Sequence, residues 1–463
     1  MGPERFELSI SNSANWCLIH TRRRAQYFLF NISIKLFLTK TNICSSISYI
    51  MKKIDYVKQI FYDSTGIIQN EDIEVEFRDE EIDIIADLLS GKKVNDEPNN
   101  PKIDRIFESY LLKLKKSMEK KNIPILIKKK WPSGKRFAVA ITHDADRISV
   151  DKEHFNKVKD RFTEEIIEEF RDGIKDPYWN VEEMAKIEKE FGFKSSFYLL
   201  LSEYQIDQKL QTFKILMNEG WEIGLHGGFD THNNKNELLK QIELFSKYFG
   251  NKPKGIRQHY LEFDPENTWR IMNDLKLKYD TTWGFNKNPG FKAGISLPFY
   301  PPDFEWEYFD ILEIPLILMD TSLWGYMDLD EEQGLELTRN IIGIIKKTEG
   351  LFTILWHQEA LMMKRGRIYR EILKMLSNEE CFVESGLAIH EWWTSRKNTT
   401  TKAEKQGNEW IYSIRNPPES LVVEVHYKNS ENIKIKGKGT INKKTNTIVE
   451  IEVMENCEII VRE

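Results

Sequence analysis

The sequence predicts an α/β fold with a parallel sheet at its centre, and three observations support this prediction. About seven strand-like runs alternate with helical patterns over roughly 260 residues. Several of these runs end in Asp, His or Arg, at the carboxyl ends of strands where α/β proteins build their sites. Short alternating runs near the C-terminus predict a separate β region. The number of strands favours a closed barrel, although an open, doubly wound sheet has the same spacing.

The first fifty residues differ from the rest of the chain. They contain two of the four cysteines and the cluster Arg22-Arg23-Arg24, but only two acidic residues. Their apolar stretch, 27–38, is interrupted by polar residues, so it is too short to span a bilayer and unlike a signal peptide. We therefore expect 1–50 to be a disordered or untranslated extension. Without an export signal or a transmembrane segment, we expect a cytoplasmic protein.

Residues 51–130 are predicted to form a small N-terminal α/β unit. Apolar residues at helical spacing predict one helix over 79–90, ended by Gly91, and a longer helix over 103–118. The stretch 95–101 between them contains two prolines and three asparagines, which is typical of a loop. The sequence leaves the purpose of this unit open.

Residues 131–394 contain the strand-like runs of the predicted barrel. In order, these runs are 138–142, 195–200, 221–225, 255–258, 279–282, 312–318 and 351–356. Helical patterns separate most of them. One such pattern begins at Asn180, an N-cap residue followed by Glu183, and ends at Gly192.

The composition changes twice after the barrel. Residues 395–408 are polar and contain several lysines, which predicts a linker. Residues 409–463 contain short runs of alternating apolar and polar residues, such as 421–427 and 448–453. These runs predict a small all-β module.

The overall composition excludes some kinds of partner and site. The net charge of −6 gives no reason to expect nucleic acid as a partner. The four cysteines are scattered and form no C-x-x-C pair, which fits a reducing compartment. Their spacing also argues against a structural zinc site or a disulfide framework.

Two carboxylates, Asp144 and Asp146, follow the first run of the barrel. Because side chains alternate along an extended chain, both project to the same side. Two carboxylates this close do not both stay ionised in an apolar pocket unless a cation lies beside them. We therefore interpret one as a metal ligand and the other as a general base.

A histidine, His226, ends the run 221–225 and precedes two glycines. Neutral imidazole suits divalent first-row metals, and glycines allow the backbone to approach closely. The third ligand depends on the loop that follows. A helical turn would bring Asp230 beside His226, whereas a looser loop would bring His232.

Three further candidates end later strand-like runs. Arg257 could pair with one of the aspartates and hold it ionised. His357 is our candidate general acid, and Asp320 is the carboxylate that would orient or tune it. Together with the aspartates, these residues indicate a metal-dependent hydrolytic centre.

These residues resemble the five motifs of the polysaccharide deacetylases, carbohydrate esterase family 4, which share the NodB-homology domain. The segments that carry the resemblance are Thr142-His-Asp144-Ala-Asp146, His226 with His232, Arg257-Gln-His-Tyr260, Met319-Asp320 and Leu355-Trp-His357. The resemblance covers roughly residues 135–393. It implies a distorted (β/α)7 barrel and a bound divalent metal, usually Zn²⁺.

The resemblance also implies a role for each motif. Asp144 would be the general base and Asp146 a metal ligand, with the two histidines of the second motif as the other ligands. Arg257 would brace the base, and His357 would be the general acid.

The sequence departs from the family pattern at three places. Ala145 separates two aspartates that are adjacent in many members, and Gln258 replaces the usual proline after the arginine. The two histidines of the second motif have five residues between them instead of three. With that spacing, Asp230 remains the alternative to His232 as third ligand.

The expected function is removal of acetyl from an N-acetylated sugar by a metal-dependent carbohydrate deacetylase. Tyr260, Trp283 and Trp356 are the candidate substrate-binding residues, because aromatic rings stack on sugar faces. Two alternatives stay open. One is hydrolysis of a C–N bond in a small cyclic amide on the same barrel, and the other is glycan binding without turnover.

Overall fold

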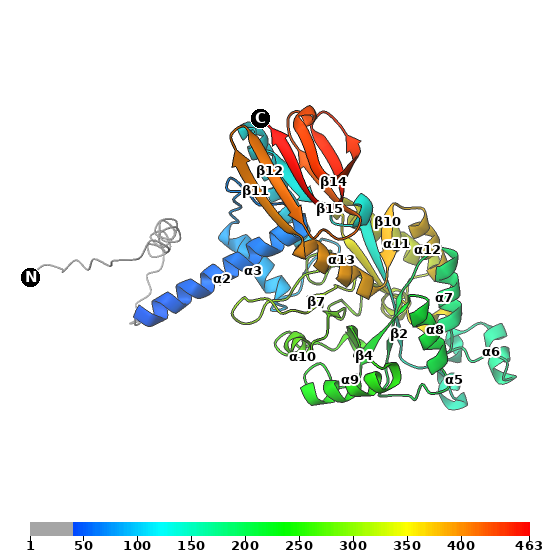
Figure 1. Cartoon of the computed structure of the whole chain (residues 1–463). Coiled ribbons are helices and arrows are strands. Elements are labelled where there is room, and N and C mark those ends of the chain that lie inside the picture. Colours follow the sequence, from blue (N-terminus) through cyan, green and yellow to red (C-terminus); the bar gives the residue numbers. More distant parts are fainter. Residues whose placement is uncertain (1–39) are drawn as a thin grey trace, which may run out of the picture. The chain divides into compact units, whose positions relative to one another are not determined.

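The computed structural model describes residues 40–463, with side chains described from residue 48 onward (Figure 1). The chain divides into two compact units, Met1–Met51 and Lys52–Glu463, and the features below lie in the second unit. Most of the expected extension, 1–39, lies outside the described residues. Helix α2 (Lys40–Thr65) includes the last part of it. Among the described residues, no helix combines the length and apolar character needed to cross a membrane.

A curled parallel sheet forms the centre of the second unit (Figure 1). Its strand order is β7-β6-β5-β4-β3-β2-β9-β8, and β10 also pairs with β2. The strands are β2 (Phe137–Ala145), β3 (Ser196–Leu199), β4 (Glu222–Gly227), β5 (Gly255–Gln258), β6 (Tyr279–Asp280), β7 (Leu312–Glu313), β8 (Leu318–Met319), β9 (Leu351–Leu355) and β10 (Cys381–Glu384). Every residue of β2 is buried, as expected for a strand with neighbours on both edges. The predicted α/β class is confirmed.

One stretch of chain joins the two ends of this sheet. β7 pairs with β6, and β8, which follows shortly after in the sequence, pairs with β9. Pro315 lies between them and has no N–H to donate to a ladder. The single strand predicted over 312–318 is therefore two short strands. They form the two ends of the described sheet, which curls into a distorted barrel.

Helices follow most of the strands. They are α3 (Asp79–Leu89), α4 (Lys102–Lys121), α5 (Lys152–Val158), α6 (Glu164–Arg171), α7 (Val181–Glu190), α8 (Leu210–Asn218), α9 (Lys235–Phe249), α10 (Thr268–Asp274), α11 (Glu331–Thr348), α12 (Ile368–Ser377) and α13 (Gly386–Asn398). Short helical turns are η1 (Pro132–Gly134), η2 (Lys159–Arg161), η3 (His259–Leu261), η4 (Ser322–Tyr326), η5 (Gln358–Met362) and η6 (Ser430–Asn432). The Asn180 side chain does not cap α7. It donates to the carbonyl oxygens of Pro177 and Gln358 instead.

An antiparallel sheet contains the C-terminal part of the chain. Its strands are β1 (Ile125–Lys128), β11 (Thr400–Gln406), β12 (Glu409–Arg415), β13 (Leu421–His426), β14 (Ile433–Lys444) and β15 (Ile448–Arg462). Their order is β1-β13-β15-β12-β11, with β14 also paired to β15. Residues 395–408, expected to be a linker, instead form the end of α13 and β11. The sheet also takes in β1, from the segment expected to be an N-terminal unit.

Buried Arg396 connects helix α13, on which it lies, to α2 and β1. Its guanidinium donates to the carbonyl oxygens of Asp63, Lys128 and Lys129 over 2.7–3.0 Å. Three carbonyl acceptors satisfy a charge that would otherwise be costly to bury. Its burial lowers the pKa of Arg396 to about 10, so it stays charged at neutral pH.

Candidate active site

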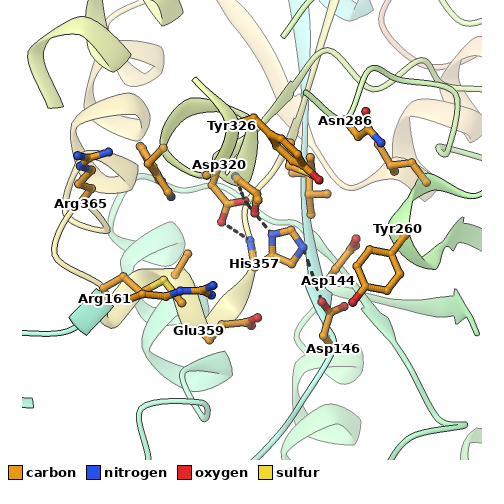
Figure 2. A pocket seen from close by; sticks show the side chains of 18 of the residues that line it. Asp144, Asp146, Arg161, Tyr260, Asn286, Asp320, Tyr326, His357, Glu359 and Arg365 are labelled. Carbon is orange, nitrogen blue, oxygen red and sulfur yellow. Dashed lines mark hydrogen bonds and ion pairs between the residues drawn. The ribbon is translucent and has the colours of Figure 1, made fainter. Parts of the chain in front are cut away.

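Polar side chains at the carboxyl ends of the barrel strands line one cavity of about 620 Å³ (Figure 2). They come from the ends of β2, β4, β5, β8 and β9. The residues predicted from the sequence that line it are Asp144, Asp146, His226, Tyr260, Asp320 and His357. Parallel strands bring their carboxyl ends to one edge, which explains how residues so far apart in the chain meet.

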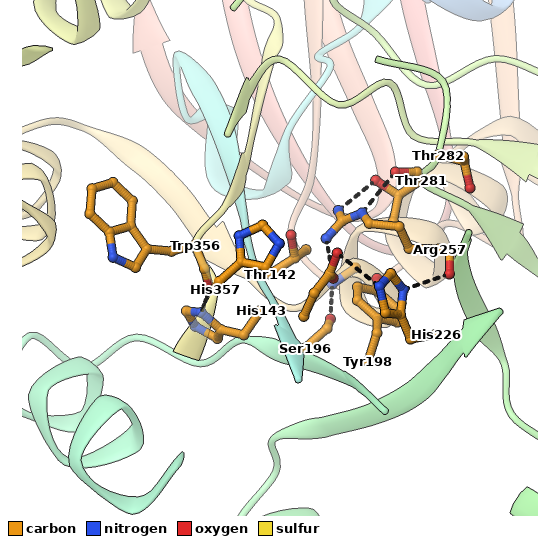
Figure 3. A network of polar contacts seen from close by, with 12 residues as sticks. Thr142, His143, Ser196, Tyr198, His226, Arg257, Thr281, Thr282, Trp356 and His357 are labelled. Carbon is orange, nitrogen blue, oxygen red and sulfur yellow. Dashed lines mark hydrogen bonds and ion pairs between the residues drawn. The ribbon is translucent and has the colours of Figure 1, made fainter. Parts of the chain in front are cut away.

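Asp144 forms an ion pair with Arg257, and both side chains are almost inaccessible to solvent. Arg257 Nη1 donates to Asp144 Oδ1 over 2.9 Å (Figure 3). Thr281 anchors the other side of the guanidinium, because its carbonyl oxygen accepts from Nε (3.0 Å) and its hydroxyl from Nη2 (3.2 Å). The fixed guanidinium thus places a positive charge directly against this buried carboxyl group. The second oxygen, Asp144 Oδ2, lies 3.6 Å from His226 Nε2.

Asp146, His226 and His259 form a group, which we call the cation group, whose ligand atoms lie within 4.8 Å of one another. Asp146 Oδ1 is 3.1 Å from His226 Nε2, and Asp146 Oδ2 is 3.8 Å from His259 Nε2. His226 Nδ1 donates to the carbonyl oxygen of Arg257 over 2.9 Å, so Nε2 carries the lone pair of a neutral ring. Within residues 40–463, Asp146 Oδ1 is buried without a hydrogen-bond partner.

The cation group attracts positive charge. Burial lowers the pKa of His226, but Asp144 and Asp146 raise it by more, so the net shift is upward. Burial raises the pKa of Asp146, but the nearby imidazoles of His226 and His259 outweigh this effect, and the pKa ends well below its usual range. A carboxylate kept ionised beside imidazoles favours a proton or a metal ion between them.

The donors of the cation group fit a divalent metal of the zinc type. Zn²⁺ takes imidazole nitrogen and carboxylate oxygen at about 2.0–2.2 Å. The 3.1 Å between Asp146 Oδ1 and His226 Nε2 is a separation that two ligands of one such ion can adopt. The buried Oδ1 atom without a partner is the atom that an ion would satisfy. Three protein ligands also leave a position for water or substrate, as in catalytic sites.

His357 lies between Asp320 and Asp146 (Figure 2). Asp320 holds it twice: Oδ1 accepts from His357 Nδ1 over 2.7 Å, and Oδ2 from the His357 backbone N–H over 2.9 Å. His357 Nε2 lies 3.9 Å from Asp146 Oδ2. Burial lowers the pKa of His357, but Asp320 and Asp146 raise it by more, so the pKa is well above its usual value. The ring is therefore poised to donate a proton from Nε2.

Glu359, two residues after His357, also lines the cavity, although it was not among the predicted site residues. Burial raises its pKa to about 8, with Asp146 acting in the same direction and His357 in the opposite one. The preceding residue is fixed, because Gln358 Nε2 donates to the carbonyl oxygens of Arg147 and Tyr178. Glu359 is thus held at the cavity in a state that readily exchanges a proton near neutral pH.

His232, predicted as the third ligand, lies outside the cation group. Its Nδ1 is 3.2 Å from Glu262 Oε2, and its carbonyl oxygen accepts from Thr268 Oγ1 over 2.8 Å. Asp230, the alternative, is exposed and has a positive φ of 64°, so the chain does not continue as a helical turn after His226. Neither His232 nor Asp230 lines the cavity.

The third member of the group, His259, was missed as a candidate ligand. A usable signal exists, because His259 follows Arg257 by two residues at the end of β5. Alternation along an extended chain places both side chains on the same side. The family motif that this chain resembles has its second histidine ligand soon after the first, which favoured His232 instead.

Of the three predicted substrate-binding residues, only Tyr260 lines the cavity. Trp283 packs against Phe263 with ring centroids 4.9 Å apart, and Trp356 packs against Tyr369 at 5.3 Å. Both tryptophans are buried in the core, which corrects the prediction. Trp356 directly precedes His357, so alternation turns it to the opposite side of the chain.

Tyr260 forms part of an exposed aromatic surface at the cavity. Its side chain is 68% exposed, and its ring lies 4.1 Å from the His259 ring and 6.0 Å from the Phe229 ring. Its backbone has a positive φ of 57°, an uncommon and strained conformation for a tyrosine. Trp324 and Tyr326 also line the cavity. They lie in η4, the turn that follows β8.

The other side of β2 carries a second polar cluster (Figure 3). His143 Nδ1 donates to the carbonyl oxygen of Trp356 over 2.8 Å, and His143 Nε2 lies 2.6 Å from Glu188 Oε1. Glu188 also accepts from Tyr369, Ser195 and Trp221, each over 2.7 Å. The hydrogen bond from His143 to the Trp356 carbonyl links β2, which carries Asp144, to the residue that directly precedes His357.

No family model matches the chain, and no curated protein matches it in sequence. Solved structures do match. A protein described as a polysaccharide deacetylase from Mycobacterium smegmatis is 18% identical, with 60% of this chain and 96% of that chain covered and a TM-score of 0.43. Another so described, from Pseudomonas aeruginosa, is 13% identical, with 57% and 93% covered and a TM-score of 0.44.

An allantoinase, Puue, is 14% identical, with 59% of this chain and 95% of that chain covered and a TM-score of 0.43. The matching structures thus include polysaccharide deacetylases, the family that the five motifs resemble. At these identities and TM-scores, the chemistry of this chain has to be inferred from its own side chains.

Proposed function

We propose that this chain is a metal-dependent hydrolase that removes acetyl from an N-acetylated sugar. One observation carries the proposal: a buried carboxylate, Asp144, and an imidazole with a raised pKa, His357, flank the cation group in one cavity. Amide hydrolysis needs a base for the attacking water, an acid for the leaving nitrogen and stabilisation of the oxyanion between them. Asp144 would be the base and His357 the acid. A metal ion held by the cation group would stabilise the oxyanion.

A divalent cation bound here, which we propose is Zn²⁺, would polarise the acetamide carbonyl and lower the pKa of water. Asp144 would accept at Oδ2 the proton of the water that attacks the carbonyl carbon. His357 would donate its Nε2 proton to the nitrogen as the C–N bond breaks, so that acetate and a free amine leave. Each of these proton transfers contributes about 10²–10⁴-fold to the rate.

Four neighbouring residues support these roles. Arg257 would keep Asp144 ionised and oriented, and Asp320 would hold the His357 ring with Nε2 toward the cavity. Tyr260 and Trp324 present aromatic rings on which a sugar could stack.

The proposal is tested by acetate release from N-acetylated sugars, with Zn²⁺ added and with metal removed by a chelator. We expect release only with metal. Asp144→Asn and His357→Gln should each lower kcat by about 10²–10⁴-fold, and Asp144→Asn should keep its bound metal. Metal binding without acetate release from any sugar would contradict the proposal. Hydrolysis of a small cyclic amide instead would favour the alternative reaction on the same barrel.

A further inference from the structure

Three basic side chains that the proposed reaction does not use line one wall of the cavity. They are Arg161, Lys364 and Arg365, and we call them the basic wall. Figure 2 shows the Arg161 side chain extending into the cavity toward His357 and Glu359. The basic wall therefore borders the space in which a substrate of the cation group would lie.

The main chain fixes two of these cations next to each other. Phe162 and Met363 form an antiparallel bridge, and the Lys364 N–H donates to the carbonyl oxygen of Arg161 over 2.9 Å. Lys364 Nζ donates to the carbonyl oxygen of Asp160 over 2.9 Å. The bridge thus places Arg161 and Lys364 opposite each other, and both line the cavity. An anion bound beside them would be attracted by both charges.

A separate small core positions Arg161. The segment between β2 and α7 contains α5, η2 and α6, and five of its buried residues, from Val150 to Tyr178, form a core of their own. Phe162 is 1% exposed, and its ring lies 5.5 Å from that of Phe155 and 6.2 Å from that of Tyr178. Arg161 is therefore attached to a rigid support at the cavity edge.

Within the described part of the chain, one carboxylate forms an ion pair with the basic wall. Neither Arg161 nor Lys364 forms such a pair there, and Arg365 pairs with the highly exposed Asp328. Two arginines close by in the sequence that do not line the cavity are paired, Arg367 with Glu331 and Arg370 with Glu190.

Two carboxylates, Asp160 and Glu359, lie near the basic wall in the cavity lining. Among residues 40–463, neither forms an ion pair with Arg161 or Lys364, and only the main-chain oxygen of Asp160 accepts from Lys364. Arg161 and Lys364 therefore line the cavity without an ion-pair partner among the described residues.

We propose that the basic wall binds an anionic group of the substrate, a phosphate or a carboxylate, so that the substrate is an acidic N-acetylated sugar. This inference rests on the proposed function. Guanidinium and ammonium groups recognise both anions through charge-assisted hydrogen bonds. The aromatic rings of Tyr260 and Trp324 would contact the sugar, and the basic wall would select its charged substituent.

The test compares three sugars: N-acetylglucosamine 1-phosphate, N-acetylmuramic acid and neutral N-acetylglucosamine. For the wild-type protein with metal, we expect kcat/KM for one acidic sugar to exceed that for the neutral sugar by roughly tenfold or more, through KM. This preference should shrink as salt is raised, because exposed charges are screened. The double variant Arg161→Gln/Lys364→Gln should lower the ratio of acidic to neutral rates. Arg367→Gln, a matched loss of charge outside the cavity, should leave it unchanged.

A binding measurement separates this inference from the proposed function. Calorimetry with Asp144→Asn measures affinity for the same sugars without turnover. Selective binding of an acidic sugar, lost in the double variant, would support the basic wall even if no acetate were released. Equal kcat/KM and equal affinity for all three sugars, or a preference unaffected by the double variant, would overturn the inference while acetate release still supported the hydrolase. The preferred acidic sugar would distinguish phosphate from carboxylate.

Discussion

Two polar clusters lie on opposite sides of the same strand, β2, and they differ in whether their hydrogen bonds are complete. In the cluster around His143, both oxygens of Glu188 accept hydrogen bonds, and both ring nitrogens have partners. In the cluster around Asp146, Oδ1 is buried without a partner among the described residues, although two imidazoles lie close by. Both clusters are buried or nearly so, so burial alone does not separate them.

The difference indicates which cluster is structural and which one binds a ligand. A buried polar network that satisfies all its members stabilises one arrangement of the chain and needs nothing further. A buried carboxylate oxygen without a partner requires an explanation, and a cation beside it provides one. Adjacent residues of one strand can thus serve folding on one side and chemistry on the other.

The largest effect should come from breaking the complete cluster. Glu188→Ala removes the shared partner of four buried polar groups. Because each buried group left without a partner costs about 1–3 kcal/mol, we expect a loss of about 3–5 kcal/mol in the free energy of unfolding. Chemical denaturation of the metal-free protein measures this loss. Glu190→Ala, on the same helix but at an exposed ion pair with Arg370, should change stability by only about 0.5 kcal/mol. Equal effects of the two variants would show that the His143 cluster is not structural.

The incomplete cluster should respond to metal, and the complete one should not. At a Zn²⁺ concentration 100 times the dissociation constant, binding should stabilise the wild-type protein by about 2.7 kcal/mol. Asp146→Asn should lose this increase, whereas Glu188→Gln, though less stable, should keep it. Thermal denaturation with Zn²⁺ and with a chelator makes the comparison. If Zn²⁺ still stabilised Asp146→Asn by the same amount, the ion would bind at another site.

A smaller effect should appear in the dependence of stability on pH. Burial lowers the pKa of His357, but Asp320 and Asp146 raise it well above 6.5 in the folded state. A raised pKa means that the folded state binds more protons, so this contribution is complete below pH 6.5 and is lost as the pH rises through the raised value. The metal-free protein should therefore become less stable toward alkaline pH.

The pKa of His226 is also raised, so the wild-type protein alone does not show which histidine causes the pH dependence. The contribution of His357 is isolated by the Asp320→Asn variant. Its free energy of unfolding should depend less steeply on pH than that of the wild type above pH 6.5. Denaturation curves over this range measure the slope. Identical slopes would mean that Asp320 does not raise the pKa of His357.

Much of the barrel could be predicted because its strands are continuous apolar runs. β2, β4 and β9 each overlap a run that the sequence marks clearly. The pairing of β1 with β13 could not be predicted, since it joins segments about 300 residues apart and no local pattern specifies it. The split of 312–318 at Pro315 had a visible cause, but which edges β7 and β8 join is set by closure of the whole barrel.

The same distinction applies to the candidate site. Strand-end positions led to Asp144, Asp146, His226 and His357, because alternation and parallel strands constrain where such residues lie. The choice between His232 and His259 depends on the turn at Asp230, a left-handed conformation that the sequence did not specify. Which aromatic residues line the cavity was hardest to predict, because aromatic rings at strand ends occur both in the core and at cavities.

The most direct test of the central claim, that Asp146, His226 and His259 hold one divalent ion, is calorimetric titration of the metal-free protein with Zn²⁺. His259→Ala and His232→Ala are the matched variants. We expect one ion per chain for the wild type and for His232→Ala, and binding weakened by more than about 100-fold for His259→Ala. Tight binding that persists in His259→Ala but disappears in His232→Ala would contradict the claim.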